Sequence, residues 1–342
     1  MRVLTVVGNR PQFIKSAPLS AAFRAAGIEE VSLHTGQHYD AQLSQVFYDE
    51  LGLPEPRYSL DSRSAAPDRM VPGIRTAVEV ERPDWVLVFG DTNSTLAGAQ
   101  AAGGTPVAHV EAGLRSFDLE MPEERNRIAV DRIAALLLCP DERSAAQLET
   151  EGVQGRREIV GDVMRDALDL FAPIADRLRQ DRDSPYALLT IHRASNTEPE
   201  QLRRLIAELN ATGWTFVFPV HPRTRQVLDD NDIRLSPRIE AVEPRGYLEL
   251  LALIRGATRV VTDSGGLQKE AYWLGIPCVT LRTTTEWVDT VAAGANTLVD
   301  PNDPSNLGSV LTNASFPENA PQLYGDGHAS ERVAAALYAS RP

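Results

Sequence analysis

Short apolar runs alternate with amphipathic stretches along almost the whole chain. In the first half the apolar runs predict strands at 3–7, 31–35, 85–89, 106–110, 136–139 and 157–160. Helical periodicity fills the intervals, for example at 13–26, 41–51, 95–102 and 122–135. Strands without polar alternation, separated by helices, are typical of a parallel sheet that is buried on both faces. The first half is therefore predicted to be a doubly wound α/β domain.

The same pattern starts again after a long helical stretch at 164–182. The second-half strands are predicted at 187–191, 215–220, 259–262, 278–281 and 297–299. Two consecutive α/β halves predict two Rossmann-like domains that face a cleft, an N-terminal one over 1–165 and a C-terminal one over 166–324. We expect the final helix, within 325–342, to cross back and pack on the N-terminal domain.

Charge and composition exclude several classes of protein. The chain has 342 residues with 34 basic and 47 acidic side chains, so its net charge is −13. Nucleic acids and anionic membranes are bound by dense positive charge, and neither is expected as a partner. No apolar run approaches the roughly 18 residues that span a bilayer. With no signal-peptide pattern at the N-terminus, we expect a cytoplasmic protein.

The turn after the first strand, from Gly8 to Lys15, is suited to bind an anion. A glycine turn that opens a helix presents backbone N–H groups and the positive end of the helix dipole. Arg10 and Lys15 add positive charge. A tight turn with a salt-bridged arginine gives the same pattern without a ligand. Neither GxGxxG nor a Walker loop occurs in the chain, which argues against NAD and ATP.

A second such turn, Ser264-Gly265-Gly266, follows the predicted strand 259–262. Its hydroxyl and glycine amides suit a diphosphate at a helix N-terminus, although a plain helix cap has the same sequence. Glu270, nearly two turns into that helix, can accept hydrogen bonds from ribose hydroxyls.

Three carboxylates follow neighbouring strands in the first half. Asp91 and Glu111 come directly after two of them, and Glu123 opens the next helix. Because the carboxyl ends of parallel strands lie at one edge of the sheet, we expect the three to share one site. Such a cluster serves either general acid/base chemistry or a metal. Taken singly, Asp91 and Glu123 also suit helix starts.

The histidines give no metal-binding spacing. His192 and His221 both end predicted second-half strands, but neither HxH nor HExxH occurs, so zinc is not expected. His34 and His109 lie inside apolar strands and are interpreted as hydrogen-bonded core residues. His38 belongs to the turn 35–40.

Taken together, the chain resembles the non-hydrolysing UDP-N-acetylglucosamine 2-epimerase family. The segments that carry the resemblance follow one order from Gly8 to Trp287: GNRPQFIKSAPL, TGQHYD, VFGDTNSTLAGA, HVEAGLRSFD, MPEERNRIAVDRIA, GDVM, TIHRASNTE, PVHPRT, TDSGGLQKEA and LRTTTEW. The resemblance implies two Rossmann-like domains of the glycosyltransferase-B type with a UDP-sugar in the cleft. It also implies a homodimer that uses no metal and no other cofactor.

The resemblance further implies a reaction. UDP is eliminated across C1–C2 of the sugar to give 2-acetamidoglucal, and is then added back with the proton on the other face. An anion clamp for UDP and carboxylates near C2 are the parts this chemistry needs.

Roles for individual residues come from the same resemblance. Asp91, Glu111 and Glu123 match the catalytic acids, and His192 matches the residue that assists the leaving diphosphate. The predicted binding residues are Arg10, Lys15, Tyr247 for uracil, Ser264, Gly265 and Gly266 for the diphosphate, and Glu270 for the ribose.

Some positions depart from the best-known branch of the family. Trp287 stands where that branch has arginine, and Lys269 where it has glutamate. The GNRPQF, GQHYD and TTEW segments resemble the branch of UDP-2,3-diacetamido-glucuronate 2-epimerases and archaeal enzymes. The alternatives are therefore an epimerase of such a modified sugar and a hydrolysing epimerase that releases ManNAc and UDP. A glycosyltransferase gives no reason for three clustered carboxylates, and a silent nucleotide-sugar sensor would be expected to have lost one of the three.

Overall fold

The structure, a computed structural model, describes residues 1–37, 51–60, 62, 64 and 66–341. The chain divides into two compact units. Unit 1 comprises Met1–Leu170 and Tyr324–Pro342, and unit 2 comprises Phe171–Leu323. Most of the predicted helix at 41–51 and the residues His38, Tyr39 and Asp40 lie outside the described part of the chain.

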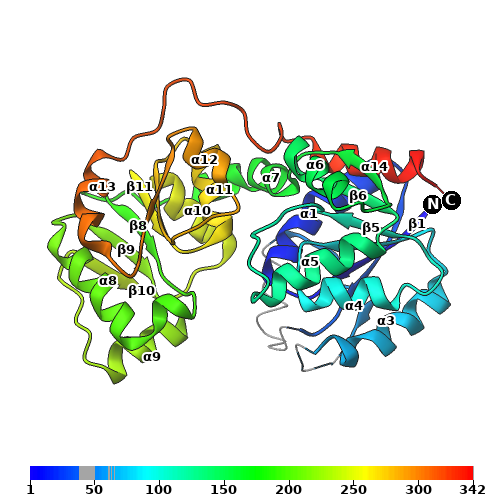
Figure 1. The fold of residues 1–342 in the computed structure, drawn as a ribbon, viewed down its shortest axis with the longest axis horizontal. Helices are drawn as coiled ribbons and strands as arrows, with labels where there is room; N and C mark the ends of the chain where they lie inside the picture. Colours follow the sequence, from blue (N-terminus) through cyan, green and yellow to red (C-terminus); the bar gives the residue numbers. More distant parts are fainter. Residues whose placement is uncertain (38–50, 61, 63, 65, 342) are drawn as a thin grey trace. The chain divides into compact units, whose positions relative to one another are not determined.

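Unit 1 is built on a parallel sheet (Figure 1). Its described strands are β1 (Arg2–Val7), β2 (Glu29–His34), β3 (Tyr58–Ser59), β4 (Trp85–Phe89), β5 (Val107–Val110), β6 (Leu136–Cys139) and β7 (Arg156–Ile159), in the spatial order β3-β2-β1-β4-β5-β6-β7. Its helices are α1 (Arg10–Ala25), α3 (Pro67–Glu81), α4 (Asn93–Ala101), α5 (Pro122–Ile133), α6 (Glu142–Thr150) and α14 (Ala329–Ala339), and α7 (Val163–Leu178) runs on into unit 2.

Unit 2 repeats the architecture with a second parallel sheet. Its strands are β8 (Ala187–Thr190), β9 (Phe216–Pro219), β10 (Ile239–Val242), β11 (Arg259–Thr262), β12 (Cys278–Leu281) and β13 (Asn296–Val299), in the order β10-β9-β8-β11-β12-β13. Its helices are α8 (Pro199–Ala211), α9 (Pro222–Asp230), α10 (Tyr247–Gly256), α11 (Gly265–Trp273), α12 (Val288–Ala292) and α13 (Leu307–Asn313), with short 3-10 turns at Ser195–Thr197 and Pro304–Asn306.

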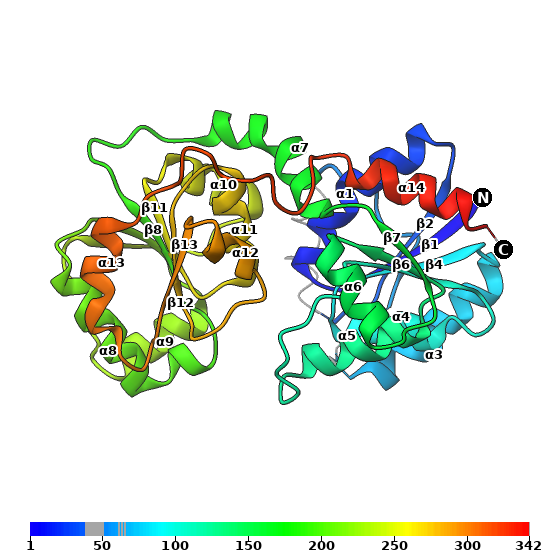
Figure 2. The ribbon, with the colours of Figure 1, turned by 45° about the horizontal axis from the view of Figure 1, so that its top comes forward.

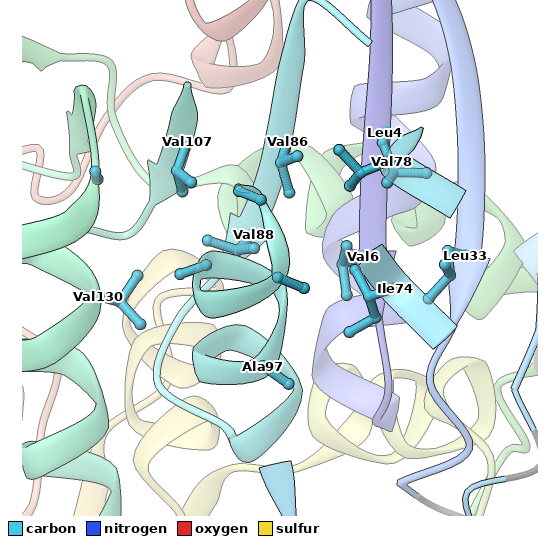
Figure 3. Close-up of a cluster of buried hydrophobic side chains, with 14 of the residues drawn as sticks. Leu4, Val6, Leu33, Ile74, Val78, Val86, Val88, Ala97, Val107 and Val130 are labelled. Carbon is cyan, nitrogen blue, oxygen red and sulfur yellow. The ribbon is translucent and has the colours of Figure 1, made fainter. Parts of the chain in front are cut away.

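Each sheet is buried between two layers of helices. In β8, Ala187 and Leu189 pack with side chains of α8, α9 and α13, whereas Leu188 packs with α10 and α11. In unit 1, Leu4 and Val6 of β1 meet Ile74 of α3 in one continuous core, which extends to α4 and α5 (Figure 3). This alternation between two apolar layers explains why the strands read as continuous apolar runs.

The predicted fold class is confirmed, and the central strands lie within two residues of their predicted ends. Two strands, β3 and β10, were not predicted. Both lie at an edge of their sheet, and in β10 two of four residues are exposed. An edge strand that is partly solvated lacks the continuous apolar run by which the central strands are found.

The C-terminal helix α14 packs against α1 in unit 1. Asp166 accepts hydrogen bonds from the backbone amides of Ala329 (3.1 Å) and Ser330 (2.6 Å) and so caps the start of α14. At the other end the Tyr338 hydroxyl donates to the carbonyl of Ala26 (2.9 Å). The two chain termini lie beside each other in this unit (Figures 1 and 2).

Each sheet has a point where the strand order reverses. In unit 1 the strands β2 and β3 lie on one side of β1, and the strands from β4 onward lie on its other side, so the reversal is between β1 and β4. In unit 2 the strands β9 and β10 lie on one side of β8 and β11 lies on the other, so the reversal is between β8 and β11. In open α/β sheets, ligands bind beyond the carboxyl ends of the strands at such a point. The two reversal points therefore mark where a site is expected in each unit. Among the described residues, no helix is long and apolar enough to cross a membrane.

Candidate active site

The turn between β1 and α1 is built around two tightly packed residues. A Cβ atom on Gly8 would lie 1.9 Å from Ser94 Oγ, so only glycine fits there. Gln12 is 2% exposed; it accepts from the Gly8 amide (2.8 Å) and donates to the Phe89 carbonyl (3.0 Å). The Gln12 side chain therefore joins the ends of β1 and β4, the two strands at the reversal point. Asn9 caps α1 by accepting from the Gln12 amide (3.2 Å).

Lys15 and Glu111 form an ion pair at this edge of the sheet. The Lys15 ammonium contacts Glu111 Oε2, and both side chains are largely buried. Glu111 directly follows β5 with φ = 73°, in the left-handed region that residues other than glycine rarely adopt. Backbone strain of this kind is maintained only where the surrounding structure fixes it, and it occurs preferentially at functional sites.

Asp91 pairs with Arg127, which comes from α5. Asn126, the preceding residue, donates to the Asp91 carbonyl (3.0 Å) and to Asn93 Oδ1 (2.8 Å), so α5 holds the segment after β4 at two points. Burial raises the pKa of Asp91; the Arg127 charge opposes that shift and the nearby Glu111 charge adds to it. The two ion pairs thus form one electrostatically coupled cluster.

The predicted third carboxylate, Glu123, is exposed in the first turn of α5. Its neighbour Glu124 is buried instead. It accepts from the Ser116 (3.0 Å) and Phe117 (3.1 Å) amides and pairs with Arg127 (2.5 Å). Asp91 and Glu111 are therefore brought together as predicted, whereas the structure places Glu124 rather than Glu123 beside Arg127.

In unit 2 the segment after β8 carries His192, whose imidazole is half exposed. Its backbone amide and that of Arg193 donate to the carboxylate of Asp263, which follows β11 (3.0 and 2.9 Å). His192 and Asp263 therefore lie at the reversal point of this sheet. The pKa of His221, after β9, is lowered by burial and by the His192 charge, so the two histidines are close.

The Ser264-Gly265-Gly266 turn opens α11 beside Asp263, as predicted. A Cβ atom on Gly265 would lie 2.7 Å from Glu286 Oε1, so any larger residue there would require this carboxylate to shift. Glu286 is paired with Arg282 (2.9 Å), which offsets its negative charge next to the turn. Glu270 is buried in α11.

Two aromatic contacts involve residues that were named from the sequence. Tyr247, the first residue of α10, is buried and meets Phe171 edge-on with ring centroids 5.8 Å apart. The Lys269 ammonium lies 3.9 Å from the centroid of the Trp287 indole in a cation–π contact. The two departures from the best-known branch of the family are therefore in contact with each other. Arg10, the first residue of α1, is half-buried in unit 1.

Several residues of these clusters were not found from the sequence. Arg127 lies four residues after Glu123 on the same helix, and this spacing on one helix face is the signal that could have found it. Asp263 directly follows β11, and this place after a strand end is the signal that could have found it. For Gln12 and Asn126 no sequence signal distinguishes them from surface amides. Within the described residues, no group of three His, Cys, Asp or Glu side chains is arranged to hold a metal ion.

Taken together, the two parallel sheets and polar clusters at both reversal points define a two-domain α/β enzyme of the glycosyltransferase-B-like fold. The family model described as UDP-N-acetylglucosamine 2-epimerase matches residues 21–338, and the chain belongs to this family.

Known proteins similar over their full length support the assignment. A "UDP-N-acetylglucosamine 2-epimerase homolog" of Methanococcus maripaludis is 42% identical, covering 98% of this chain and 99% of its own. The UDP-2,3-diacetamido-2,3-dideoxy-D-glucuronate 2-epimerase of Pseudomonas aeruginosa is 41% identical, covering 98% of both. The crystal structure of Methanocaldococcus jannaschii UDP-GlcNAc 2-epimerase in complex with UDP-GlcNAc and UDP superposes with a TM-score of 0.89, at 34% identity, covering 99% of this chain and 100% of that one.

Proposed function

We propose that the protein interconverts UDP-N-acetylglucosamine and UDP-N-acetylmannosamine. The observation that carries the proposal is the coupled pair of ion pairs, Lys15–Glu111 and Arg127–Asp91, at the strand-order reversal of unit 1 in a chain of this family. The C2 proton passes to a carboxylate while the C1–O bond to the β-phosphate breaks, which leaves 2-acetamidoglucal and UDP. UDP then adds back to C1 as a proton is delivered to the opposite face of C2.

The carboxylates Asp91, Glu111 and Glu123 are proposed to serve the proton transfers and to stabilise positive charge that develops at C1. Burial raises the pKa of Asp91, which brings this group closer to the operating pH and makes it better suited to take up and return a proton. Lys15 and Arg127 hold the two paired carboxylates in fixed positions. Lys15 is also proposed as a substrate-binding residue.

The UDP moiety is assigned mainly to unit 2. Ser264, Gly265 and Gly266 at the start of α11 are proposed to bind the diphosphate, because backbone amides at a helix N-terminus favour anions. His192 assists its departure, and Arg10 is proposed as a further substrate-binding residue. Tyr247 contacts uracil, and Glu270 accepts from the ribose hydroxyls.

The proposal includes the setting in which the enzyme works. We expect a cytoplasmic homodimer that needs no metal and no nicotinamide. Light scattering of the purified protein tests the dimer, and dialysis against a chelator before assay tests the metal.

The test of the reaction is proton NMR of the purified protein with UDP-N-acetylglucosamine in D₂O. Appearance of UDP-N-acetylmannosamine with deuterium at C2 is the expected result. Free N-acetylmannosamine plus UDP would identify a hydrolysing enzyme instead. An unchanged substrate spectrum would contradict the proposal.

A second candidate substrate is UDP-2,3-diacetamido-glucuronate. It is favoured by the similarity to the Pseudomonas aeruginosa enzyme and by the Lys269–Trp287 contact, which replaces the glutamate and arginine of the best-known branch. Comparison of kcat/KM for the two substrates under the same conditions decides between them.

A further inference from the structure

One buried carboxylate, Asp263, collects several donors from the segment that carries His192. Its side chain is completely buried. It accepts from the His192 amide (3.0 Å), the Arg193 amide (2.9 Å) and the side-chain amide of Asn196 (3.2 Å). The fourth contact joins Asp263 Oδ1 to Nδ1 of the His192 ring at 3.0 Å. Burial alone would raise the pKa of Asp263, but these bonds hold it below its ordinary value, so the carboxylate is ionised.

An ionised carboxylate only accepts hydrogen bonds, so a hydrogen bond across this 3.0 Å contact requires the proton to be on Nδ1 of His192. The atom left to interact with a substrate is then Nε2, on a ring that is 46% exposed. A carboxylate in this position both selects the tautomer and stabilises the positive charge of a protonated ring.

The same carboxylate also fixes where His192 lies relative to the glycine turn. Asp263 is joined to Ser264 through the backbone, and the Thr190 and Thr262 hydroxyls, 2.6 Å apart, hold the ends of β8 and β11 together. His192 and the Ser264-Gly265-Gly266 turn are therefore parts of one rigid arrangement.

We propose that Asp263 is a positioning residue that fixes His192 as the Nδ1–H tautomer and directs Nε2 to the diphosphate bound at the glycine turn. This inference rests on the proposed role of His192 in UDP departure. As the C1–O bond breaks, negative charge grows on the β-phosphate. With Nδ1–H held by Asp263, a second proton on Nε2 makes the ring an imidazolium, which stabilises this charge by donating from Nε2. Asp263 keeps the ring oriented in both directions of the reaction.

The test compares the full-length wild type with Asp263→Asn by ¹⁵N NMR of histidine-labelled protein, with His192→Gln used only to assign the signal. In the wild type at a pH where the ring is neutral, His192 is expected as the Nδ1–H tautomer. The amide of the variant donates to Nδ1, so the tautomer changes to Nε2–H. We expect kcat to fall by roughly 10²-fold or more, with KM and the Kd for UDP changed only a few-fold.

The matched control is Asn196→Ala, which removes another hydrogen bond to Asp263 without touching the ring. It is expected to lower thermal stability and leave the tautomer and kcat within a few-fold. A wild-type His192 in the Nε2–H form overturns the proposal even where Asp263→Asn does not fold. An unchanged tautomer and kcat in a folded variant overturns it equally. Failure of the epimerase assignment would be visible separately, as a wild type that has the expected tautomer but forms no epimer.

Discussion

At the scale of single residues, the unit 1 site consists of charges that depend on one another. Glu111 is held by Lys15 in a strained backbone conformation, and Asp91 is held by Arg127. Each carboxylate raises the cost of ionising the other, while each cation lowers it. Removal of one charge therefore disturbs the remaining three, and conservative substitutions are the informative ones.

The first prediction concerns Asp91→Asn. The amide keeps the size of the side chain but cannot take up a proton, so kcat is expected to fall by about 10²-fold or more. Steady-state assays of UDP-sugar epimerisation measure this. Asp84→Asn is the matched control, because Asp84 makes its contacts with Arg2 and Arg341 and should leave kcat unchanged. A kcat within threefold of wild type for Asp91→Asn would remove Asp91 from the acid/base roles.

The second prediction separates two adjacent glutamates. Glu123 is exposed, whereas Glu124 accepts from two backbone amides and Arg127. Glu123→Gln is therefore expected to lower kcat by about 10²-fold if it transfers a proton, with an unchanged melting temperature. Glu124→Gln loses a buried charged contact and should cost roughly 1.5–3 kcal/mol of stability. Thermal unfolding and kinetics of both variants test this. A large loss of kcat in Glu124→Gln with normal activity in Glu123→Gln would mean that Glu124 is the functional carboxylate.

The sequence identifies the members of this cluster only in part, for a physical reason. Asp91 and Glu111 directly follow the ends of β4 and β5, and the geometry of a parallel sheet brings strand ends together. Arg127 reaches the cluster from the second turn of a helix, and its direction depends on how α5 packs. That packing is a tertiary property, which local patterning does not encode.

At the scale of elements, a buried network ties β4, β5 and α5 to each other. The ring of His109 lies between the Gly90 carbonyl and Asp131, 2.7 Å from each. Arg115 joins the other oxygen of Asp131 (2.8 Å) and continues to Glu151 of the segment after α6 (2.7 Å). Because Gly90 precedes Asp91 and His109 lies two residues before Glu111, this network sets the spacing of the two site carboxylates. The interpretation of His109 as a hydrogen-bonded core residue is confirmed.

The third prediction follows from Asp131. Burial by itself would raise its pKa, but hydrogen bonds from His109 and Arg115 hold the pKa below its ordinary 3.8. The stabilisation is therefore complete above that ordinary value and is lost as the pH falls through the lower folded value. Asp131→Asn should cost about 3 kcal/mol near neutral pH. Denaturant unfolding of both proteins should show this difference shrinking below about pH 4; a difference that does not change with pH would argue against an ionised Asp131.

The predictability of elements follows their burial. The central strand β4 is covered on both faces, so its sequence is apolar throughout and its bounds match the predicted ones. The helix α3 is not among the helical stretches named from the sequence; it begins in a stretch rich in Ser, Ala and Pro, with Ala66 at its N-cap and no side-chain hydrogen bond there. Without a capping residue or a clear apolar start, the sequence carries no strong signal for that helix.

At the scale of the whole molecule, the two ends of the chain belong to the same unit. Residues Gln12 to Ser20 of α1 are all buried, because α14 packs on this helix in addition to the rest of unit 1. Val333 and Leu337 of α14 are completely buried. Unit 1 therefore reaches its full core only when residues from both termini have come together, whereas unit 2 is formed by one continuous segment.

The last prediction tests this arrangement by deletion. A chain that ends after Leu323 loses α14 and exposes α1, and the loss of each large buried aliphatic side chain costs about 2–5 kcal/mol. Hydrogen exchange measured by mass spectrometry should be at least about tenfold faster in peptides of β1 and α1, since tenfold corresponds to only ~1.4 kcal/mol. Peptides of β8 and β11 should keep their protection. A chain shortened only after Ser340 retains α14 and is the control. Equal protection of α1 in both truncated chains would mean that unit 1 is stable without its C-terminal helix.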